Sequence, residues 1–155
     1  SKALGEQAVI ASGLPYQIIV PNNIYGPRQI NHFVDEFIAR AKQGDVELYG
    51  YDNTRSWLYV DDFTEAMERL IHCQAAVGEK INIGSNDEVE VIKLAEIIIE
   101  KMGISKPIDK HEAPEGSVKR RMPDITKIKT LTDWQPQTTL EDGLTKTVEY
   151  WMDQA

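Results

Sequence analysis

Five basic side chains stand out in an otherwise acidic chain because their positions would allow them to meet around one anion. They are Arg28 in one loop, Arg55 immediately before a strand-like run, and the consecutive Lys119, Arg120 and Arg121 in a polar loop. Guanidinium groups suit phosphate because they offer paired donors in a fixed fork. The pattern therefore indicates a candidate anion site, although a solvated loop with ordinary surface charges would show the same pattern.

Polar and aromatic candidates follow two of the strand-like runs. The first run leads into PNNIYGP, and a turn rich in Asn, Gly and Pro is the usual layout at the carboxyl edge of a doubly wound sheet, where ligands bind. Asn22 and Asn23 would hydrogen-bond a ligand there, or they would satisfy the backbone of the turn itself. Tyr49, in LYGYDN, offers an aromatic face to a base. Tyr51 and Tyr59 are alternatives, and packing is the other role open to all three.

The overall composition is that of one globular domain with a net negative charge. The chain has 155 residues, of which 41% are hydrophobic and 27% charged, which is enough for a real core. Its formal net charge of −8 argues against a surface for nucleic acid or for an anionic membrane, since either needs a basic footprint. We therefore expect neither nucleic acid nor membrane as a partner. A local basic pocket for a small anion is still compatible with this charge.

Cysteine and histidine usage bears on the compartment and on metal binding. Cys73 is the single cysteine, so the chain forms no internal disulfide, which fits a reducing, cytoplasmic location. No apolar stretch approaches the roughly 18–20 residues of a membrane span. His32, His72 and His111 stand far apart without the spacing of metal ligands, so we predict no metal site.

Alternating strand and helix patterns predict an α/β or α+β fold. Helices are expected over 2–12, 31–43, 62–71 and 90–102, over a short stretch after Asp124 and over a last stretch after Thr139. Strands are expected over 17–20, 46–49, 56–60 and 80–83, with 107–111 extended. Asp62 with Glu65 predicts a capping box for its helix, which is expected to bury Ile71. Thr139, with Asp142 at the third position, is expected to cap the last helix.

Six segments of the chain resemble, in order, motifs of the extended short-chain dehydrogenase/reductase family. They are SKALGE, NNIYGPR, LYGYDNTRSWLYVDD, GEKINIGS, EGSVKRRMPDITKIKTLTDWQP and LEDGLTKTVEYW. Each is unspecific alone, whereas six in this order are specific and resemble the nucleotide-sugar epimerases, dehydratases and decarboxylases of that family. The resemblance implies the last helix–strand unit of a Rossmann-type, doubly wound domain, together with the small α/β substrate-binding domain of such an enzyme.

The resemblance also implies catalytic and cofactor roles near the start of the chain. Lys2 would be the active-site lysine, which holds the nicotinamide ribose of NAD and lowers the pKa of the catalytic tyrosine. Pro21, just after the last sheet strand, would lie near the nicotinamide. The family's tyrosine would fall three residues before Ser1. The glycine-rich loop that cradles the NAD pyrophosphate is likewise expected upstream, because this sequence contains none.

Four residues would contact a nucleotide-diphosphate sugar if the resemblance holds. Asn23 would contact the sugar or the diphosphate, and Tyr49 would lie against the nucleobase. Arg55 and Arg121 would bind the diphosphate, where charge-assisted bidentate contacts are strongest. The turn before Arg55 reads GYDNTR, which departs from the glycine-rich form usual in the family, although Asp and Asn also favour turns.

A domain division and a function follow from these implied roles. Residues 1–28 would be the C-terminal remnant of the NAD-binding domain and residues 29–155 the nucleotide-sugar domain, with some elements allowed to intermix. The intact enzyme would be a UDP-sugar 4-epimerase, with a UDP-glucuronate decarboxylase or a dTDP-sugar 4,6-dehydratase as alternatives. The 155-residue chain alone would be inactive, and a non-catalytic binding or self-association module is the competing hypothesis. A strand and helix cut from a parallel sheet predict a homodimer, or packing that covers residues 1–20.

Overall fold

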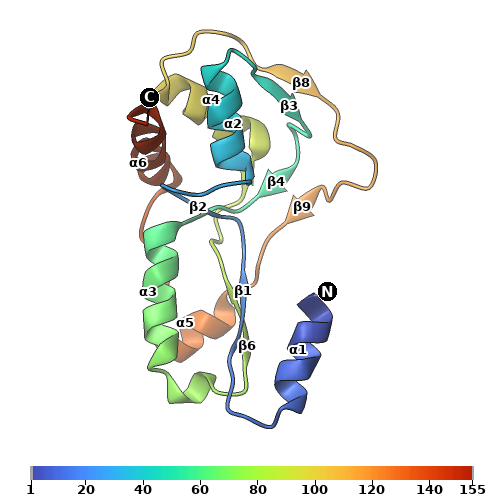
Figure 1. Cartoon of the computed structure of the whole chain (residues 1–155), viewed down its shortest axis with the longest axis vertical. Coiled ribbons are helices and arrows are strands. Elements are labelled where there is room, and N and C mark those ends of the chain that lie inside the picture. The colour runs from blue at the N-terminus through green and yellow to red at the C-terminus, as the bar shows by residue number, and fades with distance from the viewer. Residues whose placement is uncertain (1, 155) are drawn as a thin grey trace.

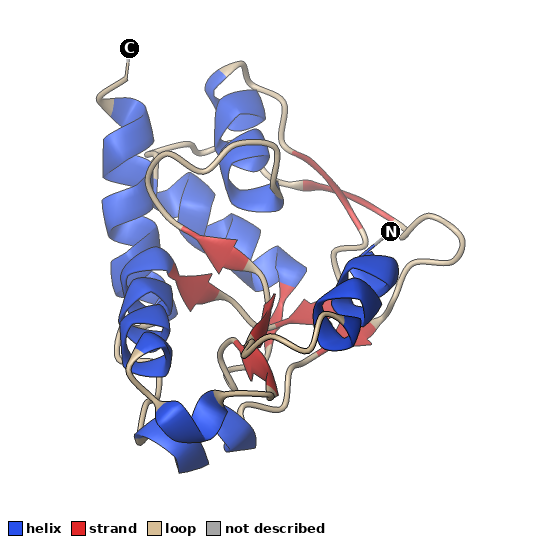
Figure 2. Ribbon diagram, turned by 60° about the horizontal axis from the view of Figure 1, so that its bottom comes forward, coloured by secondary structure: helices blue, strands red, loops and turns tan. Residues whose placement is uncertain are grey.

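The computed structural model describes residues 2–154, and its helices and short strands alternate along the chain (Figure 1; Figure 2). The helices are α1 Lys2–Ala11, α2 Phe33–Lys42, α3 Val60–Ile71, α4 Val91–Lys101, α5 Thr126–Thr132 and α6 Leu140–Met152, with a 3-10 turn at Gln74–Ala76. The strands are β1 Ile18–Pro21, β2 Ile24–Tyr25, β3 Glu47–Tyr49, β4 Thr54–Arg55, β5 Leu58–Tyr59, β6 Lys80–Ile83, β7 Val89–Glu90, β8 Asp109–His111 and β9 Arg120–Arg121. This order confirms the predicted mixed α/β class.

Most of the strand pairs are parallel. β1 runs beside β6 in a register that extends from Ile18↔Lys80 to Pro21↔Ile83. β2 pairs with β5, and β3 pairs with β8, both in parallel. β4 lies between antiparallel β7 and parallel β9. Because parallel neighbours cannot be joined by a tight hairpin, each of these parallel pairs brings together segments that are far apart in sequence.

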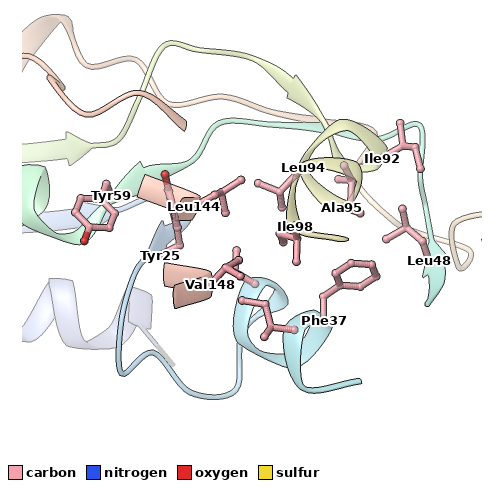
Figure 3. Close-up of a cluster of buried hydrophobic side chains, with 13 residues drawn as sticks. Tyr25, Phe37, Leu48, Tyr59, Ile92, Leu94, Ala95, Ile98, Leu144 and Val148 are labelled. Atoms are coloured by element: carbon pink, nitrogen blue, oxygen red, sulfur yellow. The ribbon is translucent and has the colours of Figure 1, made fainter. Parts of the chain in front are cut away.

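A first hydrophobic core fills the half of the molecule that is drawn uppermost in Figure 1. It packs α2, α4 and α6 against one another and against β3, and Figure 3 shows buried side chains meeting between these elements. Leu94, Ala95 and Ile98 are buried on one face of α4, as the helical spacing of apolar residues requires. This core fixes the position of β3 and of the start of α4, both of which contribute to the pocket described below.

A second hydrophobic core fills the other half of the molecule, where α3 and α5 pack near β6 (Figure 1). Leu70 of α3, Ile81 and Ile83 of β6 and Ile128 of α5 are almost fully buried there. Trp134 is 1% exposed and belongs to the same core. β1 therefore shares a core with α3, β6 and α5, which lie far from it in sequence. The expected domain division had left room for such mixing of elements. The domain division at residue 28 itself stays a prediction.

The last helix confirms one predicted cap, and the third helix corrects a burial prediction. The Thr139 hydroxyl accepts the backbone N–H of Asp142 at 3.1 Å, so Thr139 caps α6 as expected. Ile71, by contrast, is 69% exposed, because it lies in the last turn of α3 on the side turned away from the core. Its burial, predicted from helical spacing, was therefore wrong.

Asp62 does not cap α3. The helix begins at Val60, so Asp62 lies inside its first turn, where its side chain is buried. The carboxylate instead accepts the backbone N–H groups of Gln137 and Thr138, at 3.2 and 3.0 Å. The predicted capping box is wrong because a distant loop, rather than the helix's own backbone, supplies the donors for this side chain.

Two segments predicted as loops form short strands. Residues 24–25 make β2 beside β5, and residues 120–121 make β9 beside β4. Each has only two residues, too few to show a pattern in sequence, and each depends on a partner strand from a distant part of the chain. The correction places Arg120 and Arg121 on a strand in fixed register rather than in a free loop.

Helix α1 has the least packing of the helices described. None of its residues is buried, and Leu4 and Ile10 are 71% and 48% exposed. An ion pair of 2.6 Å between Lys80 Nζ and Glu6 Oε2 links α1 to β6. Within residues 2–154, no helix is both long enough and apolar enough to cross a membrane.

Candidate functional site

A pocket of about 230 Å³ lies where β3, β4 and the starts of α2 and α4 approach the turn after β1. Its wall includes Asn23, Tyr49 and Arg55, three of the residues predicted to bind a ligand. The wall also includes Gln29, His32, Phe33 and Trp57, together with backbone at Gly50. The pocket therefore combines aromatic surface with amide and guanidinium groups, which is the usual make-up of a small-molecule site.

Asn23 is held rigidly at one side of the pocket. Its backbone is left-handed, with φ of 41°, a conformation that Asn adopts more readily than most residues. The side-chain amide donates to the Ser56 carbonyl at 2.8 Å, and the Asn23 carbonyl accepts the Leu58 N–H at 3.1 Å. The amide nitrogen thus positions the turn against the strand that follows Arg55, in line with the structural alternative raised for this residue.

Arg55 carries a charge for which the structure supplies only neutral partners. Its guanidinium donates to three backbone carbonyls, those of Thr54 at 2.7 Å, Lys119 at 3.2 Å and Val118 at 2.6 Å. No carboxylate among residues 2–154 forms an ion pair with it. Desolvation by burial, and next the nearby charge of Arg121, lower the pKa of Arg55. An anion beside the guanidinium would favour its charged form.

Arg121 is brought beside Arg55 by the pairing of β9 with β4. The two residues are Cα partners in the parallel register, and the Arg121 side chain is exposed. Like charges in register repel each other unless an anion lies between them. The pairing therefore places the two arginines side by side on neighbouring strands, with Arg121 outside the wall of the pocket.

The neighbouring basic residues are neutralised by carboxylates. Lys119 forms an ion pair with Asp52, and Arg120 contacts both carboxylate oxygens of Glu88, at 2.8 and 2.9 Å. These side chains hold β9 in place, so they do not converge on a common anion with Arg55. Two of the five basic residues that the sequence suggested, Lys119 and Arg120, are therefore excluded from the candidate anion site.

Tyr49 lies at the rim of the pocket with 55% of its surface exposed. One face of its ring stacks on His111, with ring centroids 4.7 Å apart and planes inclined by 20°. The turn that follows is tight: Gly50 has φ of 66°, and a Cβ there would lie 2.5 Å from the Asn53 side chain. The glycine at this position is therefore required, and the turn fixes the direction of the tyrosine.

Lys2 and Pro21 do not border this pocket. Lys2 is exposed at the start of α1, and Pro21 is exposed at the carboxyl end of β1, opposite Ile83. In Figure 1 the N-terminal end of α1 and the carboxyl end of β1 point the same way. The roles expected for Lys2 and Pro21 at a cofactor therefore belong to a second location, apart from the pocket that Arg55 borders.

The sequence interpretation did not single out Gln29 and Trp57 as pocket residues. Gln29 donates its amide N–H to the Ile24 carbonyl, and its Oε1 is buried without a hydrogen-bond partner within the described part of the chain. The indole N–H of Trp57 is likewise buried and unpaired there. Gln29 directly follows the NNIYGPR segment and Trp57 lies two positions after Arg55, so proximity to motif residues was the available signal.

Comparison with known proteins assigns the chain to a family. Residues 1–147 match the family model described as GDP-mannose 4,6 dehydratase. The chain belongs to the extended short-chain dehydrogenase/reductase family of NAD-dependent nucleotide-sugar epimerases and dehydratases. The family and the Rossmann-type α/β fold inferred from the six motifs are thereby confirmed.

One curated relative and two solved structures illustrate the similarity. The low-salt glycan biosynthesis protein Agl12 of Haloferax volcanii is 36% identical over 143 residues, which are 90% of this chain and 46% of that protein. UDP-glucose 4-epimerase from Thermotoga maritima, solved with UDP-glucose, is 30% identical with a TM-score of 0.85, covering 98% of this chain and 50% of that one. The dTDP-glucose 4,6-dehydratase from Bacillus anthracis, solved with NAD, is 31% identical with a TM-score of 0.83, covering 96% and 49%. The chain thus spans about half the length of these proteins.

Proposed function

We propose that this chain forms the nucleotide-sugar-binding part of an NAD-dependent UDP-sugar 4-epimerase. The observation that carries the proposal is the guanidinium of Arg55, which borders the pocket, is partly buried and contacts only neutral carbonyl oxygens among residues 2–154. A desolvated cation is stabilised by an anion, and the diphosphate of a nucleotide sugar offers two charged groups. Arg121, in register beside it, adds a second donor fork.

The other pocket residues have matching roles in this proposal. Tyr49, whose ring lies at the rim, would stack on the nucleobase with the face that His111 leaves free. Asn23 would contact the sugar or the diphosphate through its side-chain oxygen, since its amide nitrogen is engaged with Ser56. The diphosphate would thus lie between the base at the Tyr49 end and the sugar at the Asn23 end.

The NAD-binding role of the chain is a proposal of the same kind. NAD, when bound, would supply the hydride acceptor and donor for oxidation and re-reduction of the sugar. Lys2 and Pro21 would border the nicotinamide end, and their exposed side chains at one end of α1 and β1 are compatible with that contact. Lys2 would hold the ribose through its ammonium group.

The UDP-sugar 4-epimerase is preferred among the reactions of the family because the similar Thermotoga maritima structure is that of a UDP-glucose 4-epimerase with UDP-glucose. A dTDP-sugar 4,6-dehydratase is the second candidate, since the Bacillus anthracis dehydratase is similar to about the same degree. UDP-glucuronate decarboxylation is the third reaction to assay. Incubating the intact enzyme with UDP-glucose, dTDP-glucose and UDP-glucuronate separates the three reactions by their products: a 4-epimer, a 4-keto-6-deoxy sugar, or carbon dioxide.

Calorimetric titration of UDP into the 155-residue chain tests the binding role directly. We expect saturable binding that Arg55→Ala weakens by about 10- to 100-fold, because a hydrogen bond to a charged group contributes about 1.5–3 kcal/mol. Arg121→Ala should weaken it in the same direction while leaving the Arg55 contacts to the loop intact. Arg69→Ala is the matched control, since its guanidinium pairs with Glu65 on α3 at 2.7 Å.

No UDP binding at millimolar concentration, or equal binding by the Arg55 and Arg69 variants, would contradict the proposed pocket. A parallel titration of NAD addresses the competing hypothesis of a non-catalytic binding module. UDP binding without NAD binding is the result that this module predicts, whereas tight NAD binding would show that the chain itself holds the cofactor.

The domain division and the homodimer are part of the same proposal. Residues 1–28 would complete the NAD-binding domain and residues 29–155 would form the nucleotide-sugar domain. The exposed apolar side chains of residues 1–20, Leu4, Ile10 and Leu14 among them, support a partner surface there. A second copy of the chain is the partner that we propose.

A further inference from the structure

Three potential metal ligands meet on the outer face of the β3–β8 pair, away from the hydrophobic core. Glu47, Asp109 and His111 each offer one ligand atom, and these atoms all lie within 4.8 Å of one another. The parallel register makes Glu47 the partner of Asp109 and Tyr49 the partner of His111, so all four side chains share one face. Leu48, between two of them, points the other way into the core.

The imidazole of His111 is the feature that distinguishes this cluster from an ordinary acidic patch. Its Nε2 atom is shielded from solvent and has no hydrogen-bond partner within the described residues. The same atom lies 3.5 Å from an Asp109 carboxylate oxygen. Where Nε2 carries no hydrogen, this nitrogen and the carboxylate oxygen both present electron pairs, so a metal ion between them stabilises their approach, as the proton on Nε2 does in the other tautomer.

The ring of His111 is held in a defined plane. Tyr49 stacks on it with a centroid distance of 4.7 Å, and the Tyr49 hydroxyl lies 3.4 Å from a Glu47 carboxylate oxygen. Tyr49 therefore contacts two of the three potential ligands and restrains both. Outer partners of this kind orient metal ligands and raise the affinity of a site.

The nearby charged groups leave the cluster accessible to a cation. Lys106, which lies beside Glu47 and Asp109 in an adjoining hollow of about 350 Å³, donates its ammonium group to the Gly44 carbonyl at 2.5 Å. Asp45 in the same hollow is paired with Arg40 at 3.3 Å. Neither group neutralises Glu47 or Asp109, and the open hollow leaves room for water molecules to complete a coordination shell.

We propose that Glu47, Asp109 and His111 form a binding site for a divalent transition-metal ion of the zinc class. Imidazole nitrogen with carboxylate oxygens suits Zn²⁺ and Co²⁺, whereas Mg²⁺ and Ca²⁺ favour shells of oxygen alone. Zinc–ligand distances of about 2.0–2.2 Å require the three side chains to close on the ion by small rotations. Two strands in fixed register supply all three protein ligands, which leaves a position for water.

This metal site does not depend on the proposed nucleotide function. Its three ligands are outside the wall of the pocket that Arg55 borders. Tyr49 links the two sites, because it lines that pocket and stacks on His111. A failure of UDP binding therefore leaves the metal proposal standing, and a failure of metal binding leaves the nucleotide proposal standing.

Calorimetric titration of Zn²⁺ into the metal-free chain tests the site. We expect one equivalent to bind, and His111→Ala to weaken binding by more than about tenfold, since even the outer partners of a metal ligand contribute that much. His72→Ala is the matched control, because His72 is exposed at the end of α3 and has no part in the cluster. Glu47→Gln and Asp109→Asn, both at exposed positions, should weaken binding without disturbing the fold.

Co²⁺ provides a second readout, because its visible absorption reports coordination by nitrogen and oxygen ligands. We expect a d–d band on adding Co²⁺ to the wild-type chain and to the His72 variant, and its loss in the His111 variant. Absence of zinc binding overturns the proposal. Zinc binding that all three ligand variants retain, or that the His72 variant alone loses, overturns it as well.

Discussion

Arg55 and Asp62 are charged side chains that the structure surrounds with backbone groups rather than with opposite charges. Arg55 donates to the Val118 and Lys119 carbonyls, and Asp62 accepts from two N–H groups of the loop before α6. Asp62 also lies in the first turn of α3, where the helix dipole favours a carboxylate. Of these two side chains, Arg55 has no such helix terminus, and we propose that a ligand satisfies its charge.

The role of Asp62 leads to a stability prediction. Asp62→Ala should lower the free energy of unfolding by roughly 2–4 kcal/mol, because two partly buried N–H groups, of Gln137 and Thr138, lose their acceptor. Asp61→Ala is the control, since Asp61 is exposed in the same first turn and carries the same charge. Urea unfolding followed by circular dichroism measures both. Equal losses in the two variants would show that only the helix dipole is involved.

At the residue scale, the sequence identified side chains more reliably than their partners. Asn23, Tyr49 and Arg55 were selected from two separate segments, NNIYGPR and LYGYDNTRSWLYVDD, and they border one pocket. The sequence also grouped Lys119 and Arg120 with Arg55 as one anion site, but these two pair with Asp52 and Glu88. A basic residue is neutralised where another element places an acidic side chain beside it. The spacing of residues along the chain does not predict such contacts.

At the scale of elements, the short strand β9 depends on its side chains for attachment. Only two residues pair with β4, so the backbone ladder is minimal. Glu88, beside β7, accepts from Arg120 at 2.8 and 2.9 Å and from the Thr54 hydroxyl at 2.6 Å. This carboxylate thereby joins β9 to β4, and it keeps Arg121 in position beside Arg55.

The attachment of β9 should weaken in acid. Hydrogen bonds from Arg120 and then Thr54 hold the pKa of Glu88 below its ordinary value of 4.5. Since the pKa in the folded state lies below the unfolded value, the stabilisation is complete above the unfolded value and is lost as the pH falls through the folded one. NMR titration of the Arg120 and Arg121 amides should therefore give a midpoint below 4.5.

Glu88→Gln should remove that transition, because no carboxylate is left to protonate. Glu96→Gln, at an exposed position on α4, is the control and should leave the midpoint unchanged. A midpoint at or above the ordinary glutamate pKa would contradict the view that the Arg120 pair anchors the strand.

The long elements were predictable from sequence, and the short strands were not. Apolar residues at helical spacing located α2, α4 and α6 to within a few residues, because their cores demand one buried face. β2 and β9 depend on partners far away in the chain, and Glu47, Asp109 and His111 meet only because β3 pairs with β8. No local pattern reports such pairing, so the spacing of the histidines along the chain could not show that these three side chains meet.

At the scale of the whole molecule, two cores contrast with an almost unpacked first helix. The cores bury the apolar faces of the other helices, whereas α1 exposes Leu4 and Ile10 and is tied to β6 by the Lys80–Glu6 ion pair. β1 has β6 as its one strand partner within the described residues, so its other edge is open. Exposed apolar side chains next to an open strand edge are typical of an interface.

We expect self-association of the chain through this surface. Sedimentation velocity should show a dimer whose dissociation is promoted by Leu4→Glu, because a charge at a buried apolar contact is costly to desolvate. Ile30→Glu is the control, since Ile30 is comparably exposed, at 66%, but lies in the loop before α2. A wild-type chain that sediments as a monomer at all concentrations would contradict the proposed homodimer.

The contacts of Arg55 have a consequence for the thermodynamics of ligand capture. Its guanidinium already donates to backbone carbonyls, two of them in the loop that precedes β9. An arriving diphosphate would take over donors that are in use, so hydrogen bonds are exchanged rather than added. The rotamer freedom of the arginine, worth up to about 2 kcal/mol, is lost before the ligand arrives. The loop carbonyls would thus occupy the donors until a ligand replaces them, and we expect part of the binding free energy to come from the entropy of the freed loop.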